Sequence, residues 1–358
     1  MTPSPPLGVL FHWLGGLASA SFYVPYKRIR GWSWEIFWLA GGVFSWIIAP
    51  WLFAALRTHD LLGVLGAAPH ATLFWCWFWG AMWGFGGLTF GLTMRYLGLS
   101  LGMAVALGLT TVIGTLGPPI FHGTIAAMAA TPSGMMTFAG ILVTLAGIGV
   151  VARAGQMKER DLVAADGIIE STEFDLKKGF AIAVFSGVMS GCFAWGLDAG
   201  QPIRTLSLAA GTDPLSQGLP VLCVVLAGGF MTNLIWCLFL IIKNRSAGEF
   251  LRRKDAKATA GQGPALLGNY GLAALGGTLW YFQFFFYTMG ESQMGRFGFS
   301  SWTLHMASII LFSTLWGFAL GEWRSAAPRT RRFVWTGIAM LVGSTIIIGA
   351  GNYLAGPA

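Results

Sequence analysis

The sequence predicts an all-α polytopic membrane protein with ten transmembrane helices, arranged as two inverted five-helix repeats. Hydrophobic residues make up 55% of the 358 residues and charged residues only 10%, against about 25% charged residues in ordinary globular domains. The apolar residues are gathered in runs near the roughly 20 residues that cross the hydrocarbon core of a bilayer. Together with the placement of Lys and Arg, these observations exclude a soluble fold.

Ten apolar runs, separated by polar or Gly/Pro breaks, are long enough to cross a bilayer. Their expected bounds are 7–26, 34–56, 71–94, 97–121, 135–152, 178–200, 215–242, 264–289, 298–320 and 332–354. Only the polar pair Arg95 and Tyr96 separates the third run from the fourth, so these two spans should form a tight hairpin. Glycines throughout residues 80–110 favour close helix packing in lipid.

The four cysteines all lie inside apolar runs, at Cys76, Cys192, Cys223 and Cys237. They form no CxxC motif and no Cys/His ligand spacing, so we expect no disulfide, no metal site and no cofactor. The N-terminal sequence MTPSPPLGVL lacks the basic region of a signal peptide. The first apolar run is therefore expected to be retained as a span.

The basic residues predict the orientation of the spans. Nineteen of the 22 Lys and Arg residues fall in the loops after spans one, three, five, seven and nine; the others are Arg57, Arg204 and Arg296. The positive-inside rule places the basic loops in the cytoplasm and both termini outside. The net charge of +8 is thus explained by topology, and we expect the lipid bilayer rather than nucleic acid as a partner.

Short sequence matches relate the two halves of the chain. LAGG at 39–42 recurs at 226–229, GLS at 98–100 aligns with GFS at 298–300, and GI at 140–141 recurs at 337–338. A unit with an odd number of spans is inverted when it is repeated, and such pairs characterise many secondary transporters. We therefore expect a first repeat, a cytoplasmic linker loop and a second repeat at 1–152, 153–177 and 178–358.

Longer motifs are distributed along nearly the whole chain. They are His12, SFYVPYK at 21–27, WSWE at 32–35, GAMWG at 80–84, GLTMRYLG at 91–98, RAGQMKER at 153–160, WYFQFFFY at 280–287, SWTLHM at 301–306 and EW at 322–323. In this order they resemble the L-rhamnose–proton symporter family of the drug/metabolite transporter superfamily. WSWE, RAGQMKER and the aromatic run are the specific matches.

The resemblance implies ten spans in the bacterial inner membrane, with periplasmic termini, and uptake of L-rhamnose or a related 6-deoxyhexose coupled to H⁺. The chain departs from the family's pattern at Gly87 and Thr89, where asparagines are expected, and at Asp198, near which an amide is expected. These departures bear on which sugar is carried. The sequence leaves open proton or sodium coupling, stoichiometry and oligomeric state.

A sugar site requires aromatic side chains beside amides or hydroxyls in a largely apolar pocket. Trp280, Gln283 and Tyr287 follow an i, i+3, i+7 pattern and share one helix face. The expected substrate-binding residues are Trp280, Tyr281, Gln283, Tyr287, Trp83, Thr89, Tyr23 and Trp302. Any single aromatic has the alternative of packing between helices, whereas Gln283 needs a hydrogen-bonding partner inside the bundle.

Proton coupling requires an ionisable group within the membrane, where such groups are costly and mark function. The candidates are His305, His12, Glu35 and Asp198. Histidine is suited because its unperturbed pKa of about 6.5 allows titration near neutral pH. The alternatives are neutral, hydrogen-bonded histidines, and a Glu35 that pairs with Lys27 or Arg28 at the membrane surface.

Two other functions remain open at this point. The first is transport of a different sugar or metabolite by another member of the same superfamily. The second is a membrane-embedded enzyme, but the chain contains no HExxH, GxSxG or Asp/Glu-rich metal motif. The sequence therefore indicates a transporter and not an enzyme.

Overall fold

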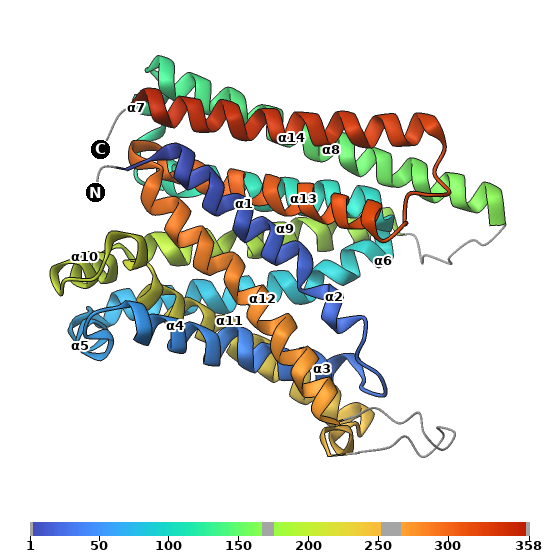
Figure 1. Ribbon diagram of the computed structural model, residues 1–358, viewed down its shortest axis with the longest axis horizontal. Coiled ribbons are helices and arrows are strands. Elements are labelled where there is room, and N and C mark those ends of the chain that lie inside the picture. The colour runs from blue at the N-terminus through green and yellow to red at the C-terminus, as the bar shows by residue number, and fades with distance from the viewer. Residues whose placement is uncertain (1–2, 167–174, 252–265, 356–358) are drawn as a thin grey trace.

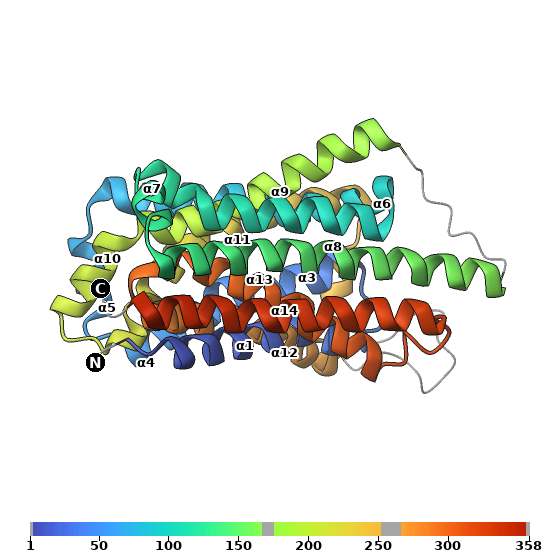
Figure 2. The same cartoon turned by 90° about the horizontal axis from the view of Figure 1, so that it is seen from above.

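The computed structural model describes residues 3–166, 175–251 and 266–355, and all regular structure in these ranges is helical. The elements are α1 (Pro5–Ser21), α2 (Tyr23–Tyr26), α3 (Trp34–Val43), the π-helix η1 (Phe44–Ile48), α4 (Ala49–Arg57), α5 (Leu61–Ala67), α6 (His70–Phe121), α7 (Ile125–Ala129), α8 (Pro132–Asp166), α9 (Leu176–Ala199), α10 (Gln201–Ala209), the 3-10 helix η2 (Pro214–Ser216), α11 (Leu219–Asn244), the 3-10 helix η3 (Ala247–Phe250), α12 (Leu266–Gln293), the 3-10 helix η4 (Gly295–Ser300), α13 (Ser301–Ala319) and α14 (Pro328–Ala355). The long helices run between the two ends of an elongated bundle, and α1 begins at the end where α14 finishes (Figure 1). We call this the terminus end; α7 and α10 also lie there (Figure 2).

Seven helical segments of the described chain are long and apolar enough to cross a membrane, or eight if the bent pair of α5 and the first part of α6 counts as one span. The seven are Pro5–Tyr26, Trp34–Arg57, Pro132–Lys158, Lys177–Ala209, Pro214–Asn244, Gly298–Ala319 and Pro328–Ala355. This makes the protein an all-α, polytopic integral membrane protein. Helix α12, which contains Asn269, Gln283 and Glu291, is not among the seven.

Helix α6 contains 52 residues but reverses its direction. Trp79 and Gly117 both pack against Trp195 of α9, whereas Leu97 packs against Gly179 near the other end of α9. A straight helix would hold residues 79 and 117 about 57 Å apart, at 1.5 Å per residue. The first and second arms of α6 therefore run antiparallel to each other along α9, as the polar break at residues 95–96 predicts.

Glycines bring helix backbones into direct contact at some positions and not at others. A Cβ at Gly80 would overlap the carbonyl oxygen of Val225 on α11, and one at Gly228 would overlap that of Trp77. Small residues of this kind allow close helix approach in lipid. At Gly87, by contrast, a Cβ would meet no described atom within 4 Å beyond its chain neighbours and the adjacent backbone of its own helix.

The second predicted span is interrupted by the π-helix η1, just before Pro50 in α4. Proline has no N–H to donate to the carbonyl group four residues earlier, so the regular α-helical ladder cannot continue through it. Single π-helical turns of this kind occur often at functional sites. The short helices α5, α7 and α10 were not predicted; they occupy connections expected to be loops.

Part of the predicted linker loop 153–177 is helical, because α8 continues to Asp166. The Asp161 carboxylate accepts hydrogen bonds from the Ala327 amide at 2.8 Å and the Thr330 hydroxyl at 2.7 Å. These contacts fix the extension of α8 to the start of α14. The remainder of the linker at 167–174, and the basic residues Arg252, Arg253, Lys254 and Lys257, lie outside the described residues.

Candidate functional site

Three titratable side chains meet where α1, α12 and α13 pack together. The ring centroid of Tyr287 lies 5.4 Å from that of His12 and 5.3 Å from that of His305, and the two histidine rings are 6.3 Å apart. Both histidines are fully buried. Gly15 of α1 permits this approach, because a Cβ there would lie 2.9 Å from the carbonyl oxygen of Gln283. We call His12, Tyr287 and His305 the His–Tyr cluster.

The His–Tyr cluster has hydrogen-bonding capacity that the described chain does not use. None of the four ring nitrogens of His12 and His305 has a hydrogen-bond partner among the described residues, nor has Nε2 of the buried Gln283. Leaving a buried polar group unsatisfied costs about 1–3 kcal/mol. Several such groups in one place indicate a site for a polar ligand or a proton.

Trp302 closes the cluster on the side of α6. Its ring centroid is 5.7 Å from that of Tyr287 and 6.3 Å from that of His305. Its indole Nε1 donates to the Thr110 carbonyl oxygen at 2.9 Å, in the second arm of α6. Trp302, one of the predicted substrate-binding residues, thus contacts the cluster, and its indole nitrogen already has a hydrogen-bond partner.

Two phenylalanines that the sequence analysis did not single out connect the predicted aromatics. Phe193 of α9 stacks on Trp302 with centroids 5.8 Å apart, and on Phe284 of α12 at 4.4 Å. Trp83 of α6 contacts both phenylalanines, at 5.0 and 5.4 Å. Phe284 then meets Trp280 at 6.1 Å. In the sequence, the position of Phe284 inside the aromatic run could have indicated its place in the site. No sequence feature indicated Phe193.

Trp280 precedes Gln283 and Tyr287 in α12 and belongs to a second aromatic group. Its ring centroid is 4.3 Å from that of Phe22, and both residues line a small cavity of about 10 Å³ with Trp38 and Trp46. The ring of Tyr23 is tilted against that of Phe22, with centroids 4.4 Å apart, and Tyr23 is 46% exposed. Trp280 therefore lies beside the central aromatics, and Tyr23 lies in an outer layer.

Tyr281 packs against a different helix, and the Thr89 hydroxyl is satisfied within its own helix. Tyr281 is fully buried and stacks on Phe53 of α4 with centroids 5.7 Å apart, as expected for the residue next to Trp280 on a helix. Its hydroxyl has no partner among the described residues. The hydroxyl of Thr89 donates to the Phe85 carbonyl oxygen of its own helix at 2.8 Å.

Glu35 lies in a different polar environment. It is 4% exposed, and its carboxylate accepts hydrogen bonds from Asn244 Nδ2 at 2.9 Å and from Ser246 Oγ at 2.8 Å. The expected pairing with Lys27 or Arg28 is therefore wrong. Lys27 Nζ instead lies 3.5 Å from the carboxylate of Glu322, which follows α13.

Asp198 lies near the end of α9, in a cavity of about 260 Å³ at the terminus end. Its carboxylate Oδ2 is 2.8 Å from Nε2 of His122, which comes shortly before α7. Tyr287 of the His–Tyr cluster also lines this cavity. The structure thus connects Asp198 to the cluster through one cavity, which we call the end cavity, and adds His122, which the sequence analysis did not identify.

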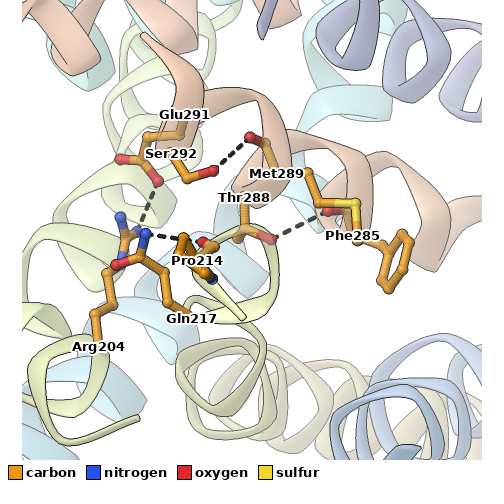
Figure 3. Close-up of polar contacts among 8 residues, drawn as sticks. All are labelled: Arg204, Pro214, Gln217, Phe285, Thr288, Met289, Glu291 and Ser292. Atoms are coloured by element: carbon orange, nitrogen blue, oxygen red, sulfur yellow. Dashed lines mark hydrogen bonds and ion pairs between the residues drawn. The ribbon is translucent and has the colours of Figure 1, made fainter. Parts of the chain in front are cut away.

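A buried ion pair fixes α12 close to the end cavity. Arg204 of α10 and Glu291 of α12 point toward each other, with guanidinium Nη2 and carboxylate Oε2 2.7 Å apart (Figure 3). Their side chains are only 8% and 17% exposed. Glu291 follows Tyr287 by one helical turn, so the pair holds the part of α12 that carries Tyr287. In the sequence, Arg204 is one of only three basic residues outside the basic loops, and this unusual position could have indicated a special role.

Apolar helices that surround buried ionisable groups, here without partners among the described residues, are typical of integral membrane transporters, because such groups mark substrate and ion pathways. The chain matches the L-rhamnose–proton symport protein family over residues 1–355, and it belongs to this family.

Similar proteins carry the same description. A relative from Cronobacter sakazakii is 38% identical over 346 residues, which cover 96% of this chain and 97% of the relative. Relatives from Salmonella paratyphi B and Salmonella newport are each 37% identical with the same coverage. All three are named L-rhamnose-proton symporters.

Proposed function

We propose that this protein is a secondary active transporter that imports L-rhamnose, or a related 6-deoxyhexose, together with protons. The observation that carries the proposal is the full-length match to the symport protein family and to relatives of that name. Family membership also makes the protein a transporter rather than an enzyme. The substrates are the sugar and the proton, and no cofactor is required.

The proposed architecture has ten crossings, formed by inverted repeats at residues 1–152 and 178–358. Seven segments meet the criterion for a span, the reversal within α6 supports two more crossings, and α12 supports a tenth. Its 28 residues extend about 42 Å at 1.5 Å per residue, more than the hydrocarbon core of a bilayer. Alternating access would then arise from one repeat rocking against the other.

The proposed location is the bacterial inner membrane, with both termini in the periplasm and the basic loops in the cytoplasm. The positive-inside rule supports this orientation, because 19 of the 22 basic residues fall on one side. It places the terminus end of the bundle, and with it the end cavity, on the periplasmic side.

The proposed sugar site is centred on Gln283, Tyr287 and Trp302, with Trp83 and Trp280 as flanking aromatics. The free Nε2 of Gln283 can donate to a sugar hydroxyl, and the aromatic rings offer surfaces for the apolar face of the sugar and its 6-methyl group. Tyr281, Thr89 and Tyr23 are secondary candidates, because Tyr281 packs on Phe53, the Thr89 hydroxyl is satisfied within α6, and Tyr23 lies in an outer layer.

The proposed proton carrier is the pair of histidines, His12 and His305. Two like charges 6.3 Å apart in a buried site repel each other, so the pair is expected to hold one proton at a time. Because Tyr287 contacts both rings, a sugar that binds to Tyr287 and Gln283 would sense this proton. Binding of the proton and the sugar together would favour the inward-facing state.

The direct test is uptake of labelled L-rhamnose into proteoliposomes, with and without an imposed inward proton gradient. We expect accumulation that depends on the gradient, that a protonophore abolishes and that related deoxy sugars compete. Absence of uptake by folded protein would contradict the sugar assignment, and a panel of other sugars would then identify the substrate.

A further inference from the structure

The end cavity leads from the protein surface to the His–Tyr cluster. His122 and Thr124, at its mouth, are exposed, whereas Tyr287, on its inner side, is 3% exposed. Asp198 is intermediate, with 29% of its side chain exposed. Asp198 and Tyr287 thus line the same cavity, and Asp198 is the more exposed of the two.

The size and lining of the end cavity suit a monosaccharide. Its volume of about 260 Å³ lies just below the range of roughly 300–1,000 Å³ typical of sites for drug-sized ligands. Met128, Phe299 and Pro118 supply apolar surface, and Asp198 and His122 supply polar groups at one place. Apolar walls with a few convergent polar groups are the pattern of a small-molecule site.

The carboxylate of Asp198 has acceptor capacity left for a ligand. An ionised carboxylate offers about four lone-pair positions, and His122 Nε2 is at hydrogen-bond distance from Oδ2. Two neighbouring hydroxyls of a sugar can donate to the two oxygens of one carboxylate. Hydrogen bonds to an ionised acceptor are roughly twice as strong as neutral ones, so this group can capture a polyol at a partly exposed position.

We infer that the end cavity is an outer binding site for the transported sugar, in which vicinal hydroxyls of the sugar displace His122 from Asp198 before the sugar moves on to Tyr287 and Gln283. The inference rests on the proposed function and adds a second, periplasmic site to it. His122 acts as a competitor for the Asp198 carboxylate when no sugar is bound.

The kinetic test compares influx with efflux for two variants that should act in opposite directions. Asp198→Ala is expected to raise the KM for L-rhamnose influx about ten- to a hundredfold, which corresponds to the loss of hydrogen bonds to a charged group. His122→Ala is expected to lower the influx KM, because the carboxylate loses its competitor. The KM for efflux from the cytoplasmic side should change less than the influx KM for both variants, because sugar from that side reaches Tyr287 and Gln283 first. Monodisperse elution of the variants in detergent shows that they fold.

Asp213→Asn is the matched control. This exposed acid lies just before η2, where it accepts a hydrogen bond from the Leu215 amide, and it does not line the cavity. The variant removes one negative charge near the same end and should leave both KM values unchanged. If the influx KM rose equally in Asp213→Asn and Asp198→Ala, the loss of a negative charge at the surface would explain both changes, and the inference would be wrong.

A labelling experiment tests occupancy directly. Met128→Cys places a thiol in the wall of the end cavity, and the four native cysteines are buried. L-Rhamnose is expected to slow the reaction of this thiol with a small methanethiosulfonate reagent, and D198A in the same background should remove the protection. If the wild type accumulates L-rhamnose but neither the influx KM nor the labelling rate changes as described, the outer site is wrong while the proposed function stands. If the wild type does not accumulate L-rhamnose, the proposed function itself fails.

Discussion

Two buried polar regions of this protein contrast sharply in how their polar atoms are satisfied. At one, the carboxylate of Glu35 on α3 accepts hydrogen bonds from Asn244 and Ser246 at the end of α11. At the other, the ring nitrogens of His12 and His305 have no partner among the described residues. Both regions contain ionisable groups with little or no exposure.

The contrast separates structural from functional polar groups within one membrane protein. A buried group whose bonds are complete stabilises the contact between its helices and has little left for a ligand. A buried group with unused capacity costs free energy in the empty protein, and that cost is recovered when a ligand or a proton binds. Of the four ionisable residues that the sequence proposed for coupling, the histidines fit this role and Glu35 does not.

The largest expected effect comes from the region with unused capacity. His305→Ala should abolish uphill accumulation of L-rhamnose, because the proton carrier is lost, while sugar exchange without a gradient continues. Accumulation and exchange are measured in the same proteoliposomes. His70→Ala, which alters an exposed histidine at the start of α6, is the control and should retain both. Normal pH-dependent accumulation by His305→Ala would remove His305 as the carrier.

The ion pair of Arg204 and Glu291 is an intermediate case, in which both buried charges are paired. Arg204→Met leaves a buried carboxylate alone and is expected to destabilise the protein by about 3–5 kcal/mol. Adding Glu291→Met should restore much of this loss, because no lone charge then remains. Unfolding in detergent measures both variants. A single variant as stable as the wild type would show that the pair does not hold α12.

A smaller effect is expected for Glu35→Gln. The amide oxygen can still accept both hydrogen bonds. Bonds to a neutral acceptor are only about half as strong as bonds to a carboxylate, so the expected loss is about 1 kcal/mol. Proton-driven accumulation should be that of the wild type. Loss of coupling with intact exchange would make Glu35 a proton carrier and would remove the distinction between the two regions.

The smallest effect is expected at the partly exposed Asp161. Hydrogen bonds from Thr330 and from the Ala327 amide favour the charged carboxylate and lower the pKa of Asp161 below its ordinary 3.8. Because the pKa in the folded state is depressed, the contact stabilises the protein above that ordinary value and is lost as the pH falls through the lowered one. Asp161→Asn should therefore flatten the acid limb of a stability–pH curve slightly; an unchanged limb would contradict this assignment.

The sequence predicted the helical class and the hairpin of α6, because apolar length and a polar break are local properties. It also singled out His12, His305 and Gln283, since a polar residue in an apolar run is conspicuous in any sequence. It could not predict that Glu35 is satisfied by Asn244, because that contact joins residues 209 positions apart.

The remaining differences between the sequence-based prediction and the structure arise from tertiary contacts. His122 and Asp198 form their pair in the lining of the end cavity, although His122 was expected in a loop and Asp198 in a span. Phe193 and Phe284 became central only because α9 and α12 bring their rings together. Periodicity predicted that Trp280, Gln283 and Tyr287 share one helix face, but it did not exclude Tyr281, whose ring packs on Phe53 of α4.

The central claim, that the histidines of the His–Tyr cluster couple protons to the sugar, is tested most directly by proton movement in lightly buffered proteoliposomes. Addition of L-rhamnose to the outside, with no imposed gradient, should make the medium more alkaline for the wild type as protons enter with the sugar. The His305→Ala variant should take up sugar down its gradient with no pH change. Equal alkalinisation by the variant, at equal sugar influx, would contradict the claim.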